Sequence, residues 1–552
     1  MSVRVVAFGD TALLVEVGGI DEAHRVASSV TEAVREGQAP AGIAEAVVGA
    51  GSVVVRLAAH VPVTEEVTAW LSDRAAAACV EGPVAVSGRS DRPHLEIPTA
   101  FDGPDLGTVA EQVGGTVDSV VAALVGSDLR VAFLGFAPGF PYLTGLPEDL
   151  AAVRRRPTPR VAVPAGAVAV AGGFASVYPE AMPGGWMLVG RTGVTLFDPV
   201  RPPYALLRPG DVVRFTAADR GGGAPPGPTP PPARTGHDIE VLHPGMLTLV
   251  EDGGRAVGAG IGVPAAGPAD PETMGLANRL AGNPNGAAAL EVTAAGPSLR
   301  FAVDSHVAVV GDGPGVVEVR IDDRPVGDGA VLPVHRGQVV TVGRVRRGLR
   351  AYLAVAGGVA TPLVVGSRST DMLSGLGPGP LRAGDWLDVG RPGRPRGRLL
   401  PPPGSAAGPG PQVLRILPGP HRSAPVAAAL VDSGPWVVGD ASNRIGVRLV
   451  PRGGGARLPG GEIPSTGMVT GAVQLPPDGH PVILMPDHAT LGGYPVIACV
   501  IAADLGRVGQ LRPGDPVSFV TVDLPAAARA RQDQERRTAD RVEGWFPTRA
   551  AT

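Results

Sequence analysis

One phrase occurs three times in this 552-residue chain, as LRPGDVVRF at 207–215, LRAGDWLDV at 381–389 and LRPGDPVSF at 511–519. In each copy a Gly-Asp pair, which admits the positive φ of a tight turn, precedes residues that alternate in polarity as a strand does. Two copies follow a GG-aromatic sequence, at 184–186 and 492–494. A common hairpin connector would explain any single copy. Because each copy ends a predicted domain, we expect related β-barrels, of which the last is most like the first.

Breaks in composition divide the chain into units. Residues 217–236 and 391–411 are rich in Pro and Gly, and we interpret both as extended linkers. The expected order is a ferredoxin-like α+β unit at 1–82, a barrel at 83–216, the linker at 217–236, a barrel at 237–390, the linker at 391–411, a barrel at 412–524 and a charged tail at 525–552.

Apolar spacing predicts several local elements. A helix from Asp21 to Gly37 should place Val26, Val30 and Val34 inward, and a second helix from Thr64 should do the same with Val67, Trp70, Leu71 and Ala78. Residues 52–57 read as a strand, and 106–125 read as one helix. We expect a peripheral helix in the tail, with Trp545 and Phe546 as docking residues.

The basic residues are all arginines, 48 in number, and the chain contains no lysine. It therefore cannot carry biotin or lipoate on a lysine, form a lysine Schiff base or complete a P-loop. A net charge of −4 with interspersed signs gives no reason to expect a nucleic-acid or membrane partner.

Cysteine usage and the chain start exclude further classes. Cys79 and Cys499 stand far apart without neighbouring ligands, so we predict neither a disulfide nor a metal site. The start lacks a signal sequence, and no apolar run approaches the roughly 20 residues of a membrane span. We expect a soluble, cytoplasmic protein.

Long ordered segments resemble known families. Those of the first half are FLGFAPGFPYLTGL (133–146), VPAGAVAVAGG (163–173) and YPEAMPGGWMLVGRT (178–192). They resemble the allophanate hydrolase subunit 1 family, which includes the B subunit of bacterial 5-oxoprolinase and a sporulation kinase inhibitor. Segments 243–270, 276–291, 350–371, 442–449 and 471–510 resemble the companion subunit 2 family, which includes the C subunit of 5-oxoprolinase. The chain looks like a B–C fusion. The resemblance implies a mainly β fold with an α+β part: a small ferredoxin-like unit followed by cyclophilin-like β-barrels.

The resemblance also implies a function. It points to ATP-dependent hydrolysis of 5-oxoproline to glutamate with ATP and Mg²⁺, carried out with a separate 5-oxoprolinase A subunit. Related modules form the carboxyltransferase part of urea carboxylase in urea amidolyases; biotin would then have to come from another chain, since this one has no lysine. A regulatory binding protein of the kinase-inhibitor type is a third hypothesis, although permanent fusion would prevent separate regulation of an inhibitor and its antagonist. The sequence does not decide whether the chain forms a homo-oligomer.

Arginine is the only strong cation available to hold the carboxylate and phosphate groups of such a reaction. Arg191 is a candidate catalytic residue, and a structural pair with Asp198 is the alternative. Arg368 and Asp371 in GSRSTD are catalytic candidates, flanked by Ser367 and Ser369 as binding residues; a capped turn is the alternative.

Other candidates come from the same segments. Arg444 is a binding candidate or a core salt-bridge arginine, and His488 is a candidate acid–base residue. The GFAPGFPYL loop could line an apolar pocket or form a plug between domains. The remaining binding candidates are Phe136, Gly139, Phe140, Tyr142, Pro164, Gly166, Tyr178, Gly184, Gly185, Trp186, Asp252, Gln474 and Tyr494.

The chain departs from the family pattern at three glutamines. Phe174, Glu251 and Ala489 stand where related sequences typically have Gln, whereas Gln474 is kept. Phe and Ala can neither donate nor accept a hydrogen bond as an amide does. We therefore expect either a changed substrate or a partial loss of activity, and we favour an active enzyme.

Overall fold

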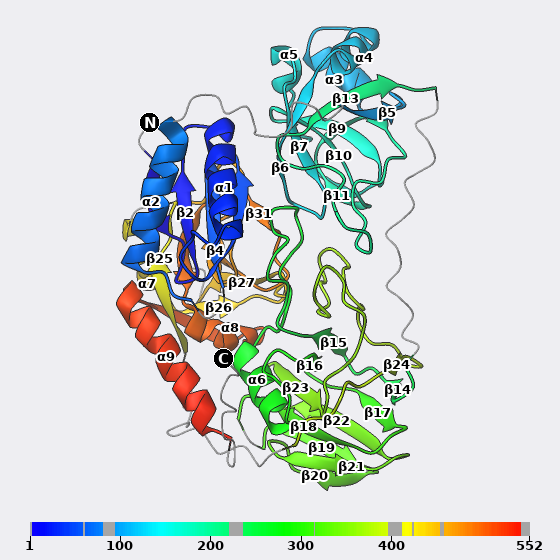
Figure 1. Cartoon of the computed structure of the whole chain (residues 1–552), viewed down its shortest axis with the longest axis vertical. Coiled ribbons are helices and arrows are strands. Elements are labelled where there is room, and N and C mark those ends of the chain that lie inside the picture. Colours follow the sequence, from blue (N-terminus) through cyan, green and yellow to red (C-terminus); the bar gives the residue numbers. More distant parts are fainter. Residues whose placement is uncertain are drawn as a thin grey trace.

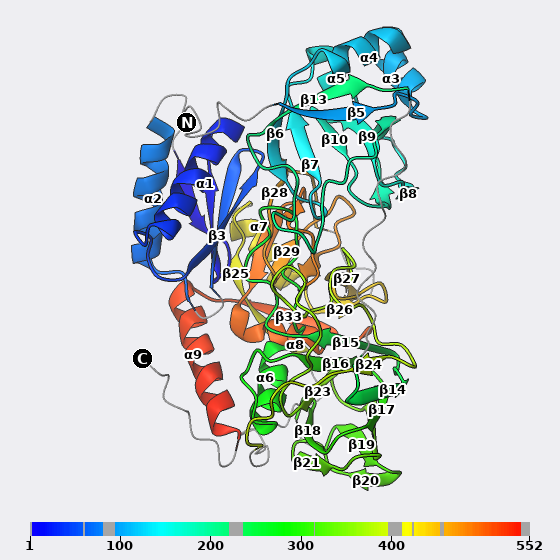
Figure 2. The same cartoon turned by 45° about the vertical axis from the view of Figure 1, so that its right-hand side comes forward.

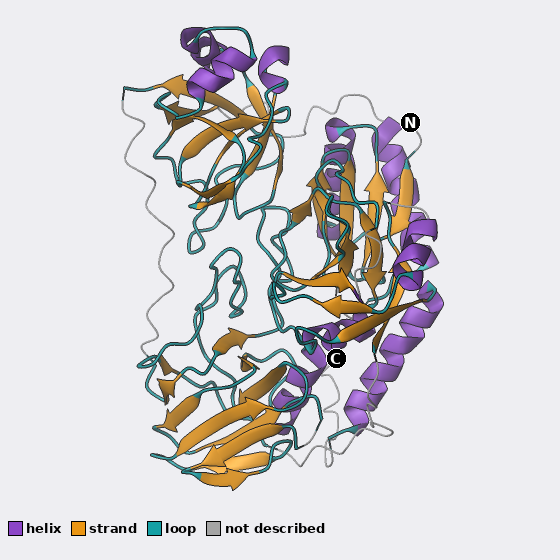
Figure 3. Ribbon diagram, turned by 180° about the vertical axis from the view of Figure 1, so that it is seen from behind, coloured by secondary structure: helices purple, strands orange, loops and turns teal. Residues whose placement is uncertain are grey.

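The computed structural model describes residues 3–58, 61–80, 94–219, 236–313, 315–395, 411–421, 424–452 and 458–542. These residues form mainly strands, and most helices lie on the outside of the molecule (Figures 1 and 3). The mainly β fold class expected from the sequence is confirmed. Most of both expected linkers, as well as Trp545 and Phe546, lies outside the described residues.

The amino-terminal unit is a four-stranded antiparallel sheet with two helices. Its strands, in spatial order, are β1 (Arg4–Ala7), β2 (Ala12–Glu16), β4 (Ser52–Leu57) and β3 (Ile43–Gly49). Helices α1 (Ile20–Arg35) and α2 (Glu65–Val80) pack side by side on the sheet (Figure 1). The unit is ferredoxin-like from β2 to α2. Its remaining edge strand is the first in the chain rather than one that follows α2.

The predicted inner faces of these helices need two corrections. Val34 is 39% exposed, and Ala33 takes the buried position on α1. On α2, Trp70 is only partly buried and lies under the Arg74 guanidinium. On α1 the small Ala33 fills the tight helix–sheet contact, so the larger Val34 next to it stays near the edge. On α2 the buried positions belong to Val67, Leu71, Ala75 and Ala78.

The first barrel follows this unit. Its seven-stranded sheet has the order β12-β9-β10-β7-β6-β13-β5, and a bridge between Ala100 and Arg191 joins the two ends of that order. The strands are β5 (Leu95–Thr99), β6 (Leu129–Leu134), β7 (Pro141–Thr144), β9 (Ala167–Ala171), β10 (Phe174–Val177), β12 (Met187–Arg191) and β13 (Val212–Ala217), with β8 (Arg160–Val163) and β11 (Met182–Gly184) as an accessory pair and α5 (Glu148–Ala151) after β7.

The single helix predicted at 106–125 is wrong. Two helices, α3 (Leu106–Gln112) and α4 (Val117–Val125), are separated at Gly114, whose φ is +67°. Thr116 then begins α4 with a capping box to Ser119. The Gly-Gly-Thr sequence therefore ends the first helix and begins the second.

The last barrel repeats the topology of the first. Its order is β25-β32-β29-β30-β27-β26-β33, and β25 closes on β33 in parallel just as β5 pairs with β13. The strands are β25 (Gln412–Pro418), β26 (Trp436–Val438), β27 (Gly446–Pro451), β29 (Ala472–Gln474), β30 (Val482–Leu484), β32 (Val496–Val500) and β33 (Pro516–Thr521), with the accessory pair β28 (Thr466–Gly467) and β31 (Leu491–Gly492) and the helices α7 (Ala424–Asp432), η2 (Ala502–Asp504), α8 (Leu505–Gly509) and α9 (Leu524–Asp540). The expected likeness of the first and last barrels is thus present strand for strand.

Between them lies a unit of two sheets rather than one closed ring. The orders are β20-β19-β22-β17-β14-β24 and β15-β16-β23-β18-β21, and side chains of both sheets share one core. The elements are β14 (Ile239–His243), β15 (Leu247–Glu251), α6 (Pro271–Leu280), β16 (Ala289–Thr293), β17 (Ser298–Phe301), β18 (Ser305–Val310), β19 (Val317–Ile321), β20 (Arg324–Val326), β21 (Val331–Val334), β22 (Val339–Val345), β23 (Arg350–Val355) and β24 (Trp386–Leu387). The barrel expected at 237–390 therefore takes a sandwich form.

The repeated phrase forms the same turn in all three units. The glycines of its turns are Gly210, Gly384 and Gly514, with φ of +86°, +87° and +89°. The aspartates that follow them accept a hydrogen bond, at 2.7–2.8 Å, from the backbone N–H of the arginine three residues earlier. The Gly-Asp pair is thus required by backbone geometry.

The amino-terminal unit packs against the last barrel, far away in sequence (Figures 1 and 2). The backbone N–H of Ala50 donates to Ser465 O at 2.7 Å, and Ser52 Oγ lies 2.8 Å from Thr466 Oγ1. The expected tail helix is present as α9, which runs from the last barrel to α6, where Thr538 donates to Glu272. These contacts bring the units around one central region.

Candidate functional site

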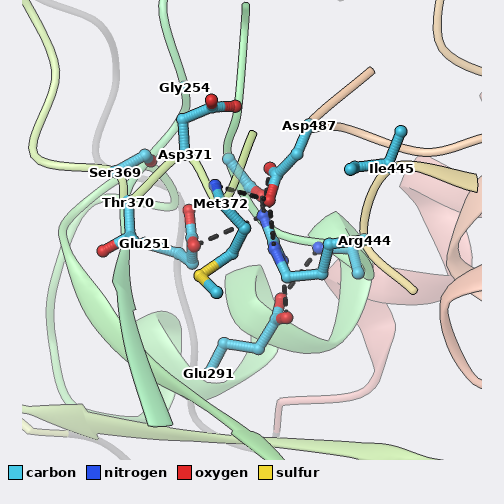
Figure 4. A network of polar contacts seen from close by, with 12 residues as sticks. Glu251, Gly254, Glu291, Ser369, Thr370, Asp371, Met372, Arg444, Ile445 and Asp487 are labelled. Atoms are coloured by element: carbon cyan, nitrogen blue, oxygen red, sulfur yellow. Dashed lines mark hydrogen bonds and ion pairs between the residues drawn. The ribbon is translucent and has the colours of Figure 1, made fainter. Parts of the chain in front are cut away.

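A buried charged cluster lies where the sandwich meets the last barrel (Figure 4). Arg444, in the loop between β26 and β27, is 3% exposed. Its guanidinium donates to Glu291 at 2.6 Å and to both oxygens of Asp487 at 2.8 and 2.9 Å, and it lies 3.3 Å from Glu251. Burial acts to lower the pKa of Arg444, but the three carboxylates raise it well above its ordinary value. The geometry is that of the salt-bridge alternative considered for Arg444.

The cluster contains more carboxyls than cations. Burial raises the pKa of Glu251 well above its usual range, and Glu291 and Asp487 raise it further against the effect of Arg444. Glu291 differs: Arg444 and Arg350 outweigh its burial and lower its pKa. Neither Glu251 oxygen makes a hydrogen bond within the described residues. The surroundings of Glu251 therefore favour its protonated form, whereas those of Glu291 favour its ionised form.

Asp252 organises the GSRSTD segment into a turn. Its carboxylate accepts hydrogen bonds from the hydroxyls of Ser367 at 2.5 Å and Ser369 at 2.7 Å, and from the backbone N–H of Arg368 at 2.7 Å. The two serines are therefore used in the turn, as in the capped-turn alternative. The Arg368 side chain is partly exposed and forms no ion pair within the described residues, which leaves it available to an anion.

Asp371 and Arg255 are buried beside this turn. Asp371 is 0% exposed; Oδ1 accepts from the N–H and hydroxyl of Ser374, whereas Oδ2 makes no hydrogen bond within the described residues. Burial, with Asp487 nearby, raises the pKa of Asp371 to about 6. Arg255 donates to Val364 O and Ser369 O, and its Nη1 has no hydrogen-bond partner among the residues that the structure describes. Unsatisfied buried donors and acceptors are costly, so their concentration here marks a candidate ligand site.

His488 lies next to the cluster but is neutral. It is 7% exposed, its Nδ1 lies 2.7 Å from Ala489 O, and burial lowers its pKa to about 4. The carbonyl contact fixes the proton on Nδ1, so a proton-accepting role would fall to Nε2.

The GFAPGFPYL loop belongs to an aromatic cluster of the first barrel. Phe140 packs against Phe136, Tyr142, Tyr178 and Trp186, with ring centroids 5.2–5.6 Å apart. Phe174, which the family resemblance suggests replaces a glutamine, packs on Tyr142 as well. Of the predicted glycines, Gly184 lies against this cluster, where a Cβ would lie 2.3 Å from Tyr178 Oη. Gly166 (φ +78°) donates its backbone N–H to Tyr178 O at 2.8 Å, and Gly185 lies near Pro159 instead.

The same loop lies between units. Gly139 donates its N–H to Ile261 O at 2.8 Å, and a Cβ on Gly135 would fall 2.2 Å from Leu491 of the last barrel. These contacts match the plug alternative. Phe136 nevertheless stays 39% exposed with a φ of +68°, a strained backbone for a non-glycine residue.

The remaining candidates lie apart from the charged cluster. Arg191 is exposed and pairs with Asp102 at 2.9 Å rather than with Asp198. Gln474 donates to the Met468 sulfur beside Gly492, and Tyr494 is 37% exposed. Pro164 turns the chain by accepting the N–H of Ala167.

Sequence reasoning missed Arg255, Glu251 and Glu291 as members of the site. All three lie within the segments that resemble the subunit 2 family, so the signal was present. It could not be recognised because the contacts that join them to the site, with Ser369 and Arg444, span more than 100 residues.

Comparison with known proteins agrees with this architecture. Residues 3–207 match the model of the carboxyltransferase domain, subdomain C and D, and residues 261–521 match that of subdomain A and B. The chain is 38% identical over 303 residues to the C subunit of 5-oxoprolinase from Escherichia coli K12, covering 54% of this chain and 96% of the relative. It is 48% identical over 130 residues to the B subunit of 5-oxoprolinase from Escherichia coli O157:H7, covering 23% of this chain and 59% of the relative.

A solved structure has the whole arrangement in one chain. The crystal structure of TTHA0988 matches with a TM-score of 0.79 and 35% identity, covering 92% of this chain and 99% of that one. The fold and cluster thus define a carboxyltransferase-domain protein with all four subdomains fused. The chain belongs to the family of the 5-oxoprolinase B and C subunits, with a B-like first half and a C-like second half. No helix among its described residues is long and apolar enough to cross a membrane.

Proposed function

We propose that this chain is the fused B–C component of an ATP-dependent 5-oxoprolinase, which hydrolyses 5-oxoproline to glutamate together with a separate A subunit. The observation that supports it most is the set of unsatisfied buried groups around Asp371 and Arg255, in a chain similar to both named subunits. A lactam acid offers an N–H, a carbonyl and a carboxylate, which such groups complement.

The charged residues of the cluster would have different roles. Arg368, a fork without an ion-pair partner in the described residues, would bind the substrate carboxylate or a phosphate of ATP. ATP supplies the driving force when bound. No three His, Cys, Asp or Glu side chains of the described residues are grouped to hold a metal, so Mg²⁺ would arrive with the phosphates. Asp371 would face the amide side of the substrate.

The test is reconstitution. Purified chain, its A partner, 5-oxoproline, ATP and Mg²⁺ should produce glutamate, and omission of any one should abolish it. Arg368→Lys keeps the charge but loses the fork, so we expect kcat/KM to fall at least about tenfold. The matched control is Arg324→Lys on β20, an exposed position that should leave activity unchanged. Absence of ATP-dependent glutamate in the complete mixture would overturn the proposal.

A carboxyltransferase acting on a urea-like substrate is the second candidate, supported by the carboxyltransferase description of both matching family models. Without lysine, the chain would need biotin carried by another protein. Transfer of labelled carboxyl from carboxybiotin to urea by the purified chain would distinguish the two.

A further inference from the structure

The segment between α5 and β8 brings three arginines to the GG-aromatic sequence of the first barrel. The Arg155 guanidinium carbon lies 6.0 Å from the centre of the Trp186 ring, and the backbone N–H of Arg156 donates to Gly185 O at 2.8 Å. Arg160 begins β8 and pairs with β11, whose last residue precedes Gly185. The three arginines therefore meet one short stretch of the barrel, on the side away from the amino-terminal unit (Figure 2).

One carboxylate holds two of these arginines. Asp105 Oδ1 accepts from Arg156 Nη1 at 2.9 Å and from Arg160 Nη2 at 2.8 Å, and its Oδ2 accepts the backbone N–H of Leu188 at 2.8 Å. Asp105 precedes α3 but makes no side-chain capping hydrogen bond to that helix. Burial acts to raise the pKa of Asp105, but the bonds from Arg160 and Leu188 lower it, so the carboxylate is ionised at neutral pH. Both of its oxygens are thus committed to this site.

The arginines carry more charge than Asp105 neutralises. Arg155 is exposed, and its side chain forms no ion pair or hydrogen bond within the described residues. Arg156 Nε and Arg160 Nη1 are buried and lack a hydrogen-bond partner among the residues that the structure describes. Like charges held side by side, with donors that have no acceptor, raise the free energy of the fold. A bound anion would lower it.

Gly185 leaves space next to these donors. Its φ lies outside the left-handed region, and the atoms nearest to a Cβ at this position would be those of Pro159 at 3.7 Å and Arg156 O at 3.9 Å. Neither backbone conformation nor packing requires a glycine here, unlike at Gly184, where a Cβ would lie 2.3 Å from Tyr178 Oη. The missing side chain therefore keeps the surface beside Arg156 open.

We propose that Arg155, Arg156 and Arg160 form a binding site for the phosphate group of a small molecule, outside the charged cluster around Arg444. Three arginines and one aspartate leave two positive charges, which match the roughly two negative charges of a phosphate monoester better than the single charge of a carboxylate. Phosphate oxygens also accept from several guanidinium forks at once. Two of the arginines are partly buried and fixed on Asp105, which suits a compact anion rather than the surface of a partner protein. The site does not depend on the proposed function.

The test is binding of inorganic triphosphate and of ATP to the purified full chain, measured by isothermal titration calorimetry at low salt. We expect both to bind, and Arg155→Gln to weaken each at least about tenfold. The matched control is Arg154→Gln, which removes the same charge from the neighbouring exposed residue, whose backbone N–H bonds to Gln112 of α3. Its affinities should stay close to those of the parent. Absence of triphosphate binding, or equal losses in the two variants, would overturn the proposal.

Two further variants locate the phosphate. Gly185→Ala should weaken binding because its methyl group enters the open space, and should leave the thermal midpoint unchanged because the nearest atoms are 3.7 Å away. The loss caused by Arg155→Gln should persist when Arg368→Gln is present in both chains, because Arg368 belongs to the candidate site. If the loss disappears in that background, or if Gly185→Ala binds as tightly as the parent, the phosphate does not lie at the three arginines.

Discussion

Among single residues, Glu251 has the carboxyl whose negative charge its surroundings disfavour most strongly. It is 0% exposed, faces Asp487 and Glu291, and is expected from the family resemblance to replace a glutamine. A protonated carboxyl has one acceptor oxygen and one donor O–H, much as an amide has an acceptor and a donor. Glu251 thus reproduces the family residue only while it keeps its proton.

This makes an unusual prediction for Glu251→Gln. Because the folded-state pKa of Glu251 is raised, the parent chain loses stability as pH rises above about 4.5, and the amide removes that loss. We expect the thermal midpoint of Glu251→Gln to exceed that of the parent at pH 8 by a few degrees (about 2–4 °C per kcal/mol in a domain of this size), with no difference at pH 4.

The matched comparison is Glu291→Gln, on the neighbouring strand. The pKa of Glu291 is lowered by Arg444 and Arg350, so its charge stabilises the fold at neutral pH and is lost on acidification. Its amide variant should be less stable than the parent at pH 7. If both variants shift the midpoint in the same direction at pH 8, the assigned protonation states are wrong.

What the sequence could reveal at this scale depends on where a residue's partners lie. Asp252 is a binding candidate in the sequence, but its partners Ser367, Arg368 and Ser369 lie 115–117 residues further along the chain and carry no local signal. The partner of Arg191 was not predicted either, because the register that closes the first barrel places Asp102 beside it.

At the scale of elements, the segment 258–263 contacts β3, the GFAPGFPYL loop and the residues that flank the GSRSTD turn. Glu45 on β3 accepts hydrogen bonds from the backbone N–H groups of Gly258 at 3.1 Å, Ala259 at 3.2 Å and Gly260 at 2.8 Å. The next residue, Ile261, accepts the Gly139 N–H, and Val263 packs beside Val364. One carboxylate therefore holds the segment on which the aromatic loop and the GSRSTD turn both rest.

Glu45→Gln should loosen this segment. An amide offers one acceptor oxygen without charge in place of two, so we expect a loss of about 1–3 kcal/mol in the free energy of unfolding. The change is measured by urea denaturation at pH 7. Glu16→Gln is the control, since Glu16 lies in the same sheet and pairs with Arg4 at the surface. Equal effects of the two variants would show that the three N–H contacts do not stabilise the segment.

Elements with local signals were predictable and those with distant partners were not. The Gly-Asp turns were identified because φ near +87° selects glycine wherever the turn occurs. The copy of the phrase at 381–389 nevertheless closes a sandwich rather than a ring, because sheet order depends on pairing between distant strands. The helix break at Gly114 has a local signal, the Gly-Gly-Thr sequence at 114–116, which apolar spacing alone does not register.

At the scale of the whole molecule, the amino-terminal unit and the last barrel share one hydrophobic core although they lie at opposite ends of the chain. Phe8 and Val54 are buried together with Met468 and Cys499. Asp10 accepts the backbone N–H of Ala502, which ties the first turn of the chain to η2. No single-sequence pattern predicts such docking, since each unit is amphipathic in the same way whichever neighbour covers it.

This arrangement predicts that the covalent link between the halves is dispensable. Residues 1–219 and 236–552, coexpressed as two chains, should copurify as a 1:1 complex in size-exclusion chromatography with light scattering, because separation would expose the shared core to water. Gly49 tests the contact, since a Cβ there would lie 2.7 Å from Ser465 O, whereas one on Gly19 would meet no atom within 4 Å. Gly49→Ala should weaken the two-chain complex at least about tenfold, and Gly19→Ala should not. Independent elution of the unmodified halves would mean that the shared core contributes little and that the linker alone keeps the candidate site together.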